Sequence, residues 1–187
     1  MIDKLSERRR EEGISVLHLY CNFQIQQSQV TAHMLVSLLK QVVGGLDFIP
    51  EEIDQKANES FNGRGLSVHE ILRLLQTTLK FHGHTFICID ALDEFGTAQL
   101  PEFLRSLDSI VTDSPNVRLF VTGRPHIQDT LGEHYGGGLE TMNFKPAKED
   151  IRVYLEMKLR DDQLRREMDS ELERAIMEEI PEKISEM

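Results

Sequence analysis

The sequence is short of several residues and patterns that mark common classes of protein. Its 187 residues include no tryptophan and only two cysteines, Cys21 and Cys88, which are too few for a disulfide framework and too scattered for a zinc site. No apolar run approaches the roughly 20 residues that a membrane-spanning helix requires, and the charged segment 1–12 does not resemble a secretory signal. We therefore expect a cytoplasmic protein that does not contact a membrane.

Basic residues are also scarce relative to acidic ones. Lys and Arg number 21 against 32 Asp and Glu, so that the formal net charge is −11 at pH 7. A protein that binds nucleic acid needs a basic surface to neutralise phosphates, and we therefore expect no nucleic-acid partner. Hydrophobic residues make up 40% of the chain, which is enough to build a packed core.

Apolar runs typical of strands alternate along the chain with stretches whose apolar residues have helical spacing. The predicted strands are 14–21, 85–89, 117–121 and a weak one at 139–144. The predicted helices are 29–43, 51–57, 67–79 with a capping box of Ser67 and Glu70, 100–111, and two closing helices from about 147 and about 165. Residues 58–65 are polar and contain glycine, which predicts a loop. This alternation predicts an α/β fold with a parallel sheet, followed by a small helical appendage.

Three acidic residues, Asp90, Asp93 and Glu94, follow the second predicted strand. In parallel α/β sheets, ligands bind beyond the carboxyl ends of the strands. A carboxylate at the position of Asp90 is able to hold a hydrated Mg²⁺, and Asp93 and Glu94 are able to orient or deprotonate an attacking water. The alternative is that Asp90 begins a turn and Asp93 caps the next helix, which requires no ligand.

The third predicted strand is followed by Thr122, Gly123, Arg124 and Pro125. A guanidinium at a strand end, stiffened by the following proline, is well placed to contact a terminal phosphate. The alternative is a surface arginine in a turn. One strand is thus followed by acidic residues, a helix comes next, and the following strand is followed by an arginine. This combination favours a phosphate site more than either strand does alone.

One part of such a site is missing from the sequence. A P-loop requires a glycine-rich turn that ends in Gly-Lys-Ser/Thr, because backbone N–H groups and the lysine hold the phosphates. The chain contains no Gly-Lys pair. The half of the site that normally provides most of the phosphate affinity is therefore absent.

These segments resemble parts of a known family. Residues 86–94 resemble the Walker B segment of NACHT domains, and residues 119–125 resemble their sensor 1 strand. Residues 148–155 resemble the start of the helical subdomain of that family. Residues 18–23 and the helix that follows them are similar to the NACHT and nephrocystin-3-like proteins abundant in filamentous fungi.

The resemblance implies a particular organisation of the chain. Residues 1–145 are expected to form a partial NACHT core of the STAND-type P-loop NTPases, with Walker B and sensor 1 but without the Walker A strand and loop. Residues 146–187 are expected to begin the helical subdomain. Because the family's P-loop precedes a helix that ends in residues similar to 1–5, we expect the chain to be a fragment of a longer repeat-containing protein, cut at both ends.

The resemblance also implies a function. Intact relatives bind ATP or GTP with Mg²⁺ and act as signalling switches that oligomerise according to the nucleotide state. In that scheme Asp90 holds Mg²⁺ through water, and Glu94, with Asp93, acts on the attacking water. Arg124 senses the γ-phosphate, and Thr122 belongs to the same cofactor site.

Other functions stay open at this point. We expect nucleotide to bind only when a P-loop is supplied, so that the chain alone is inactive and needs no cofactor, and we expect self-association or protein partners. The alternatives are a non-catalytic interaction module derived from a NACHT domain, or a hydrolase unrelated to P-loop proteins.

Overall fold

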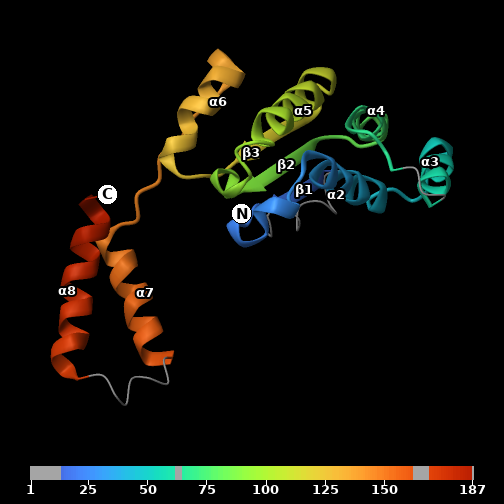
Figure 1. Cartoon of the computed structure of the whole chain (residues 1–187). Coiled ribbons are helices and arrows are strands. Elements are labelled where there is room, and N and C mark those ends of the chain that lie inside the picture. Colours follow the sequence, from blue (N-terminus) through green and yellow to red (C-terminus); the bar gives the residue numbers. More distant parts are fainter. Residues whose placement is uncertain (1–13, 62–64, 162–168, 187) are drawn as a thin grey trace. The chain divides into compact units, whose positions relative to one another are not determined.

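The computed structural model describes residues 14–61, 65–161 and 169–186 (Figure 1). The chain divides into two compact units, residues 1–139 and residues 140–187, and each is described by itself. Residues 1–5, where the family resemblance implies the end of a helix, lie outside the described residues. The sequence-based boundary between residues 145 and 146 stays a prediction.

The described part of the first unit contains a three-stranded parallel sheet (Figure 1). Its strands are β1 (Ser15–Tyr20), β2 (Thr85–Asp90) and β3 (Val117–Val121), and they lie in the order β1-β2-β3. Because all three strands run in the same direction and Tyr20 pairs with Asp90, their carboxyl ends meet at one edge of the sheet. The predicted α/β fold with a parallel sheet is therefore confirmed.

The central position of β2 explains its composition. Ile87, Cys88 and Ile89 are buried in a continuous run, as expected of a strand covered on both faces. The side chains of β3 are less covered, and Phe120 is exposed. Among the described strands, β3 pairs with β2 alone, so that its other edge carries no described partner.

Helices complete the hydrophobic core on the sheet. They are α2 (Thr31–Gly44), α4 (Val68–Leu79) and α5 (Leu100–Asp113), and each buries a stripe of leucine, isoleucine or methionine side chains. The start of α4 is capped as predicted: Ser67 accepts a hydrogen bond from the Glu70 N–H, and Glu70 accepts one from the Ser67 N–H. These reciprocal bonds satisfy N–H groups that have no partner within the helix.

Two sequence predictions are wrong. Residues 58–61 are not a loop, because α3 (Glu51–Phe61) continues through them; polarity alone does not end a helix, and glutamate is a good helix former. Residues 139–144 are not a strand: they form neither helix nor strand, and Met142 and Phe144 are exposed. A strand needs a hydrogen-bonded neighbour, and no described strand pairs with this segment.

Several short elements have no counterpart among the sequence predictions. They are the 3₁₀ turns η1 (Phe23–Ser28), η2 (Leu92–Glu94), η3 (Pro125–Ile127) and η4 (Gly136–Gly138), and the helix α6 (Gln128–Tyr135). Each is shorter than the window over which hydrophobic periodicity is readable. Three of the turns, η1, η2 and η3, directly follow the ends of the three strands.

The second unit is a pair of helices, α7 (Lys148–Asp161) and α8 (Ser170–Glu186), that pack against each other. Lys148 forms an ion pair with Glu182 across the pair, and Ile151 and Pro181 are buried. The predicted start of the last helix near residue 165 lies outside the described residues. No helix in the described ranges combines the length and hydropathy that a membrane span needs.

Candidate functional site at the carboxyl edge of the sheet

The ends of β2 and β3 are joined through the side chain of Thr122. Its hydroxyl donates a hydrogen bond to the Asp90 carboxylate and accepts one from the Ala91 N–H at 3.0 Å. Asp90 is itself exposed at the rim of the sheet. Thr122 therefore orients the last carboxylate of β2 from the neighbouring strand.

Backbone hydrogen bonds extend this link past the ends of the strands. The Thr122 N–H donates to the Ile89 carbonyl, and the Leu92 N–H donates to the Thr122 carbonyl, both at 2.9 Å. Between them Ala91 adopts a left-handed conformation with φ of 54°, which is uncommon for a residue with a Cβ. The turn after β2 is thus held in one conformation by the segment that follows β3.

Asp93 joins the two strand ends a second time. Its Oδ1 accepts a hydrogen bond from the Arg124 N–H at 3.2 Å, and its Oδ2 lies 3.5 Å from the Arg124 Nε. The Asp93 side chain is only 5% exposed, whereas that of Arg124 is 74% exposed. The buried carboxylate therefore holds the base of an arginine whose side chain reaches into solvent.

Gly123 permits this close approach. A Cβ at this position would lie 3.3 Å from Asp93 Oδ1 and 3.0 Å from Ile127 Cγ2. Both distances are shorter than ordinary van der Waals contacts, so that a larger residue would push the turn away from the carboxylate. The packing around Gly123 is therefore tight, and a side chain at this position would require Ile127 and Asp93 to shift by a few tenths of an ångström.

Glu94 is bound from the opposite side of β2. Its Oε2 accepts a hydrogen bond from the Phe23 N–H at 3.2 Å, at the start of η1. The Gln26 side chain donates to the carbonyls of Glu94 at 3.4 Å and of Phe95 at 3.3 Å. Glu94 is therefore tied to the segment that follows β1.

Phe23 and Gln26 were not singled out by the sequence analysis. One signal was available: residues 14–39 contain no Asp, Glu, Lys or Arg, although charged residues make up 28% of the chain. A long uncharged stretch that includes the exposed residues Phe23 and Ile25 is atypical of a solvated surface. The Glu94 contact itself has no signature in the sequence.

The negative charges of these carboxylates affect the pKa of the Cys21 thiol. Burial raises the pKa of Cys21 to about 12, and the negative charges of Glu94, Asp90 and Asp93 add to the effect. Its thiol therefore stays protonated at neutral pH and is no nucleophile. The other cysteine, Cys88, is buried within β2, and burial raises the pKa of its thiol as well.

The side chains of the site differ in how well they meet the requirements of different metal ions. No group of three or more His, Cys, Asp and Glu side chains is arranged to hold a metal ion within the described residues. A structural zinc or calcium site is not supported by such a set. Mg²⁺ takes only one or two carboxylates and keeps its other ligands as waters, and the exposed carboxylate of Asp90 with the adjacent Thr122 hydroxyl fits that requirement.

The predicted site residues come together. Asp90, Asp93, Glu94, Thr122 and Arg124 all lie at the carboxyl edge of the sheet, where the order of the strands places them. Their roles toward a nucleotide stay predictions. The structure adds hydrogen bonds that connect Thr122 and Arg124 to the turn after β2, which follows Asp90 and carries Asp93 and Glu94.

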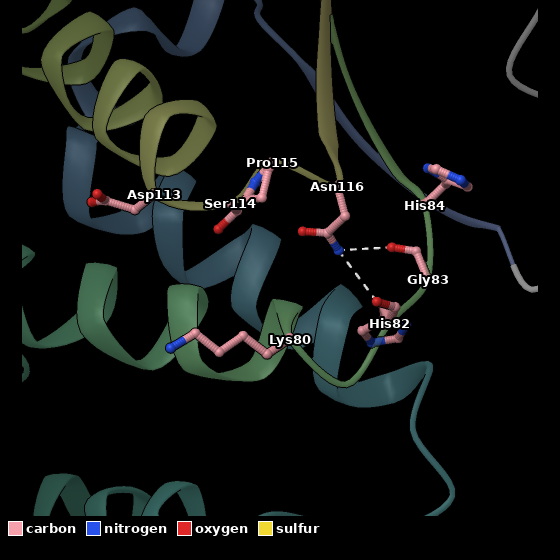
Figure 2. Close-up of a pocket in the computed structure, with 8 residues that line it drawn as sticks. All are labelled: Lys80, His82, Gly83, His84, Asp113, Ser114, Pro115 and Asn116. Carbon is pink, nitrogen blue, oxygen red and sulfur yellow. Dashed lines mark hydrogen bonds between the residues drawn. The ribbon is translucent and has the colours of Figure 1, made fainter.

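A pocket lies at the other end of the sheet (Figure 2). It has a volume of about 500 Å³ and is lined by Lys80, His82, Gly83, His84, Asp113, Ser114, Pro115 and Asn116. The Asn116 amide donates hydrogen bonds to the carbonyls of Gly83 at 2.7 Å and His82 at 3.2 Å, as the dashed lines show. Because these residues precede β2 and β3, the pocket is separate from the candidate site.

A parallel α/β sheet with a carboxylate at the end of one strand and an arginine after the next is the arrangement that the resemblance to NACHT domains predicts. The family model of the nephrocystin-3 N-terminal domain matches residues 1–124. The chain belongs to this family of NACHT-like, P-loop NTPase-related domains, which confirms the resemblance to nephrocystin-3-like proteins; the Walker B and sensor 1 assignments of residues 86–94 and 119–125 stay predictions.

A comparison with solved structures finds a Walker-type ATPase of Pyrococcus abyssi with 14% sequence identity and a TM-score of 0.47. The alignment covers 98% of this chain and 63% of that protein, so that the chain spans less than two thirds of its length. No match to the sequence is found among curated proteins.

Proposed function

We propose that the chain forms the Walker B and sensor 1 part of a NACHT-type signalling switch that responds to ATP or GTP with Mg²⁺. The observation that carries the proposal is the double link between the strand ends, Asp90 to Thr122 and Asp93 to Arg124. Through these links, a ligand that moves one strand end also moves the other. A signalling switch needs such coupling, because a ligand bound at one strand end must change the conformation of another part of the domain.

Asp90 is proposed to bind Mg²⁺ through water. It is the exposed carboxylate at the end of the central strand, and Thr122 fixes one of its oxygens. When bound, the metal ion would neutralise phosphate charge. The contribution of the chain is to hold the carboxylate in one orientation before the ligand arrives.

The structure favours different roles for Asp93 and Glu94. The Asp93 side chain is buried, accepts a hydrogen bond from the Arg124 N–H and forms an ion pair with the Arg124 side chain, so that we propose a positioning role for it. One oxygen of the Glu94 carboxylate, Oε2, accepts a hydrogen bond from the Phe23 N–H, which leaves the other oxygen outside this bond. Glu94 is therefore the better candidate to take a proton from an attacking water.

Arg124 is proposed to distinguish triphosphate from diphosphate. Its guanidinium is exposed, and its backbone N–H is fixed by Asp93. An arginine that is held at its base and free at its tip is able to contact a terminal phosphate without moving the strand. Loss of that phosphate would alter the contact with Asp93 and, through it, the turn after β2.

The phosphate-binding loop must come from another segment. The chain has no Gly-Lys pair, and in the described residues the outer edge of β3 has no partner strand. A strand that carries a P-loop would pair with this edge and bring its loop next to Arg124. The longer protein would then contain the complete site, with self-association or a protein partner reading its state.

Measurements of nucleotide binding test the proposal. We expect the chain alone to bind Mg·ATP and Mg·GTP too weakly to measure at micromolar concentrations. The same chain extended by the residues encoded directly upstream should bind one of them, and Asp90→Ala should abolish the Mg²⁺ dependence of this binding. An upstream sequence without Gly-x-x-x-x-Gly-Lys-Ser/Thr, together with no binding by the extended protein, would contradict the proposal.

A non-catalytic interaction module is the second candidate. The observation in its favour is that Asp93 and Arg124 already satisfy each other without a ligand. An interaction module would keep these contacts for stability alone. In that case the extended protein would bind its protein partner equally well with and without nucleotide.

A further inference from the structure

The η1 segment (Phe23–Ser28) is held in place almost without hydrophobic packing. None of its residues is buried, and Phe23 and Ile25 are 66% and 55% exposed. Its internal order comes from hydrogen bonds: the Asn22 side chain accepts from the Gln24 N–H at 2.9 Å, and the Ser28 hydroxyl donates to the Ile25 carbonyl at 2.8 Å. A segment with so little buried apolar surface opens at low free-energy cost.

The base of the segment is fixed more firmly than its body. The Gln29 side chain is buried, accepts a hydrogen bond from the Asn22 N–H at 3.3 Å and donates one to the Asn22 carbonyl. These two bonds close the loop at its ends. Residues 23–28 are therefore able to change position while the residues on either side of them stay in place.

The body of η1 contacts the candidate site through Glu94 and its neighbours. The Phe23 N–H donates to Glu94 Oε2 at 3.2 Å, and the Gln26 side chain donates to the carbonyls of Glu94 and Phe95. A Cβ added at Gly96 would lie 3.5 Å from Gln26 Cγ, which is ordinary contact distance. The segment thus contacts both the carboxylate and the backbone of Glu94.

The direction of this contact is informative. Since β2 lies between β1 and β3, the η1 segment and the Thr122–Arg124 turn approach β2 from opposite sides. The Glu94 carboxylate is bound on the β1 side. A terminal phosphate that contacts Arg124 would lie on the β3 side, away from the Phe23 N–H.

We propose that η1 positions Glu94 by holding its carboxylate away from the attacking water, and that release of the Phe23 N–H contact frees it for proton transfer. Phe23 and Gln26 are then positioning residues that act through Glu94. The proposal rests on the proposed function, in which Glu94 is the proton acceptor. It adds a control of hydrolysis that is separate from the recognition of phosphate by Arg124.

A pair of variants at one position isolates the hydrogen bond. Phe23→Pro removes the N–H, and proline is suited to the first position of the turn because Asn22 already has the extended conformation that precedes proline, with φ of −147° and ψ of 120°. Phe23→Ala removes the ring and keeps the N–H. Any effect of the lost ring is common to both variants, so that their difference reports the missing N–H together with the fixed φ of proline.

The first experiment uses the chain without nucleotide. Amide hydrogen exchange and the ¹³C signal of the Glu94 carboxyl are followed by NMR. Glu94→Ala should raise the exchange rate of the Phe23 amide about tenfold, as loss of a hydrogen bond to a charged group predicts. Phe23→Pro should shift the Glu94 carboxyl signal, whereas Phe23→Ala should leave it in place. An unchanged Phe23 exchange rate in Glu94→Ala would overturn the proposal.

The second experiment measures hydrolysis of Mg·ATP and Mg·GTP in the extended protein with its P-loop. Phe23→Pro should raise kcat about tenfold at constant KM, and Gln26→Ala should raise it less. A fall in kcat for Phe23→Pro, with Phe23→Ala unchanged, would show that η1 holds Glu94 in its active position and would reverse the proposal. If no form binds nucleotide while the NMR result holds, the proposed function fails and the contact stands as a structural one.

Discussion

The two ends of the sheet use polar residues in different ways. At the amino end, one neutral side chain, Asn116, donates to the carbonyls of Leu79, His82 and Gly83 and thereby joins two neighbouring turns. At the carboxyl end, the turns are joined by charged side chains, and Asp90 and Arg124 stay exposed. An amide is sufficient to connect turns, so that the charges at the carboxyl end indicate a further role.

The polar groups at the two ends of the sheet differ in the partners of their hydrogen-bond donors. The amide nitrogen of Asn116 is satisfied by carbonyls of its own chain. In the part of the chain that the structure describes, the Asp93 carboxylate is the ion-pair partner of Arg124, whose side chain is otherwise 74% exposed. Groups of the second kind retain the capacity to bind a ligand.

The largest expected effect is that of Glu94→Gln in the extended, nucleotide-binding protein. The amide keeps the shape of the side chain but is unable to accept a proton, so that kcat should fall by about 10²-fold or more while nucleotide affinity stays within about twofold. Steady-state hydrolysis and equilibrium binding measure the two quantities. If kcat and nucleotide affinity instead fell by similar factors, Glu94 would have a structural role, as Asn116 has in connecting neighbouring turns.

Asn116→Ala should affect stability and leave nucleotide binding unchanged. It removes the two amide N–H donors that share the carbonyls of Leu79, His82 and Gly83 at the end of α4 and in the following turn, and we expect a loss of about 2 kcal/mol in the free energy of unfolding. Chemical denaturation measures this loss. Lys80→Ala is the matched control, because Lys80 lines the same pocket and is exposed.

Gly123→Ala should affect both stability and ligand discrimination. The added Cβ would lie 3.0 Å from Ile127 and 3.3 Å from Asp93, which we expect to cost about 1 kcal/mol and to displace Arg124. In the extended protein, the preference for triphosphate over diphosphate should weaken. Gly132→Ala is the control, since a Cβ there meets no atom within 4 Å.

The smallest effect concerns Glu70, a carboxylate with a structural role. Hydrogen bonds from the Ser67 N–H and hydroxyl lower its pKa from 4.5 to about 2. Because the folded pKa is the lower one, the stabilisation is present above pH 4.5 and is lost as the pH falls toward 2. An NMR titration should show this low pKa, and Ser67→Ala should return it toward 4.5. A normal pKa in the unmodified chain would contradict the capping box.

Much of the fold was predictable because it depends on local patterns. The strands at 85–89 and 117–121 are short apolar runs, and the capping box is a pair of residues three positions apart. The failures, at 58–61 and 139–144, arose where the local pattern was weak. There the outcome depended on helix continuation or on a pairing partner, which a local pattern does not contain.

The sequence by itself determined which strands end in Asp90 and Arg124, since an apolar run and the polar residue after it are neighbours along the chain. It also indicated the family of the chain, through the resemblance of residues 18–23 and the helix after them to nephrocystin-3-like proteins and of residues 86–94 and 119–125 to NACHT domains. Only the tertiary structure decided that Asp93 binds Arg124, 31 positions away, and that Glu94 binds Phe23, 71 positions away. Those choices depend on the order of the strands in the sheet, because the turn after β2, which lies between β1 and β3, offers Asp93 and Glu94 to the segments that follow opposite neighbours.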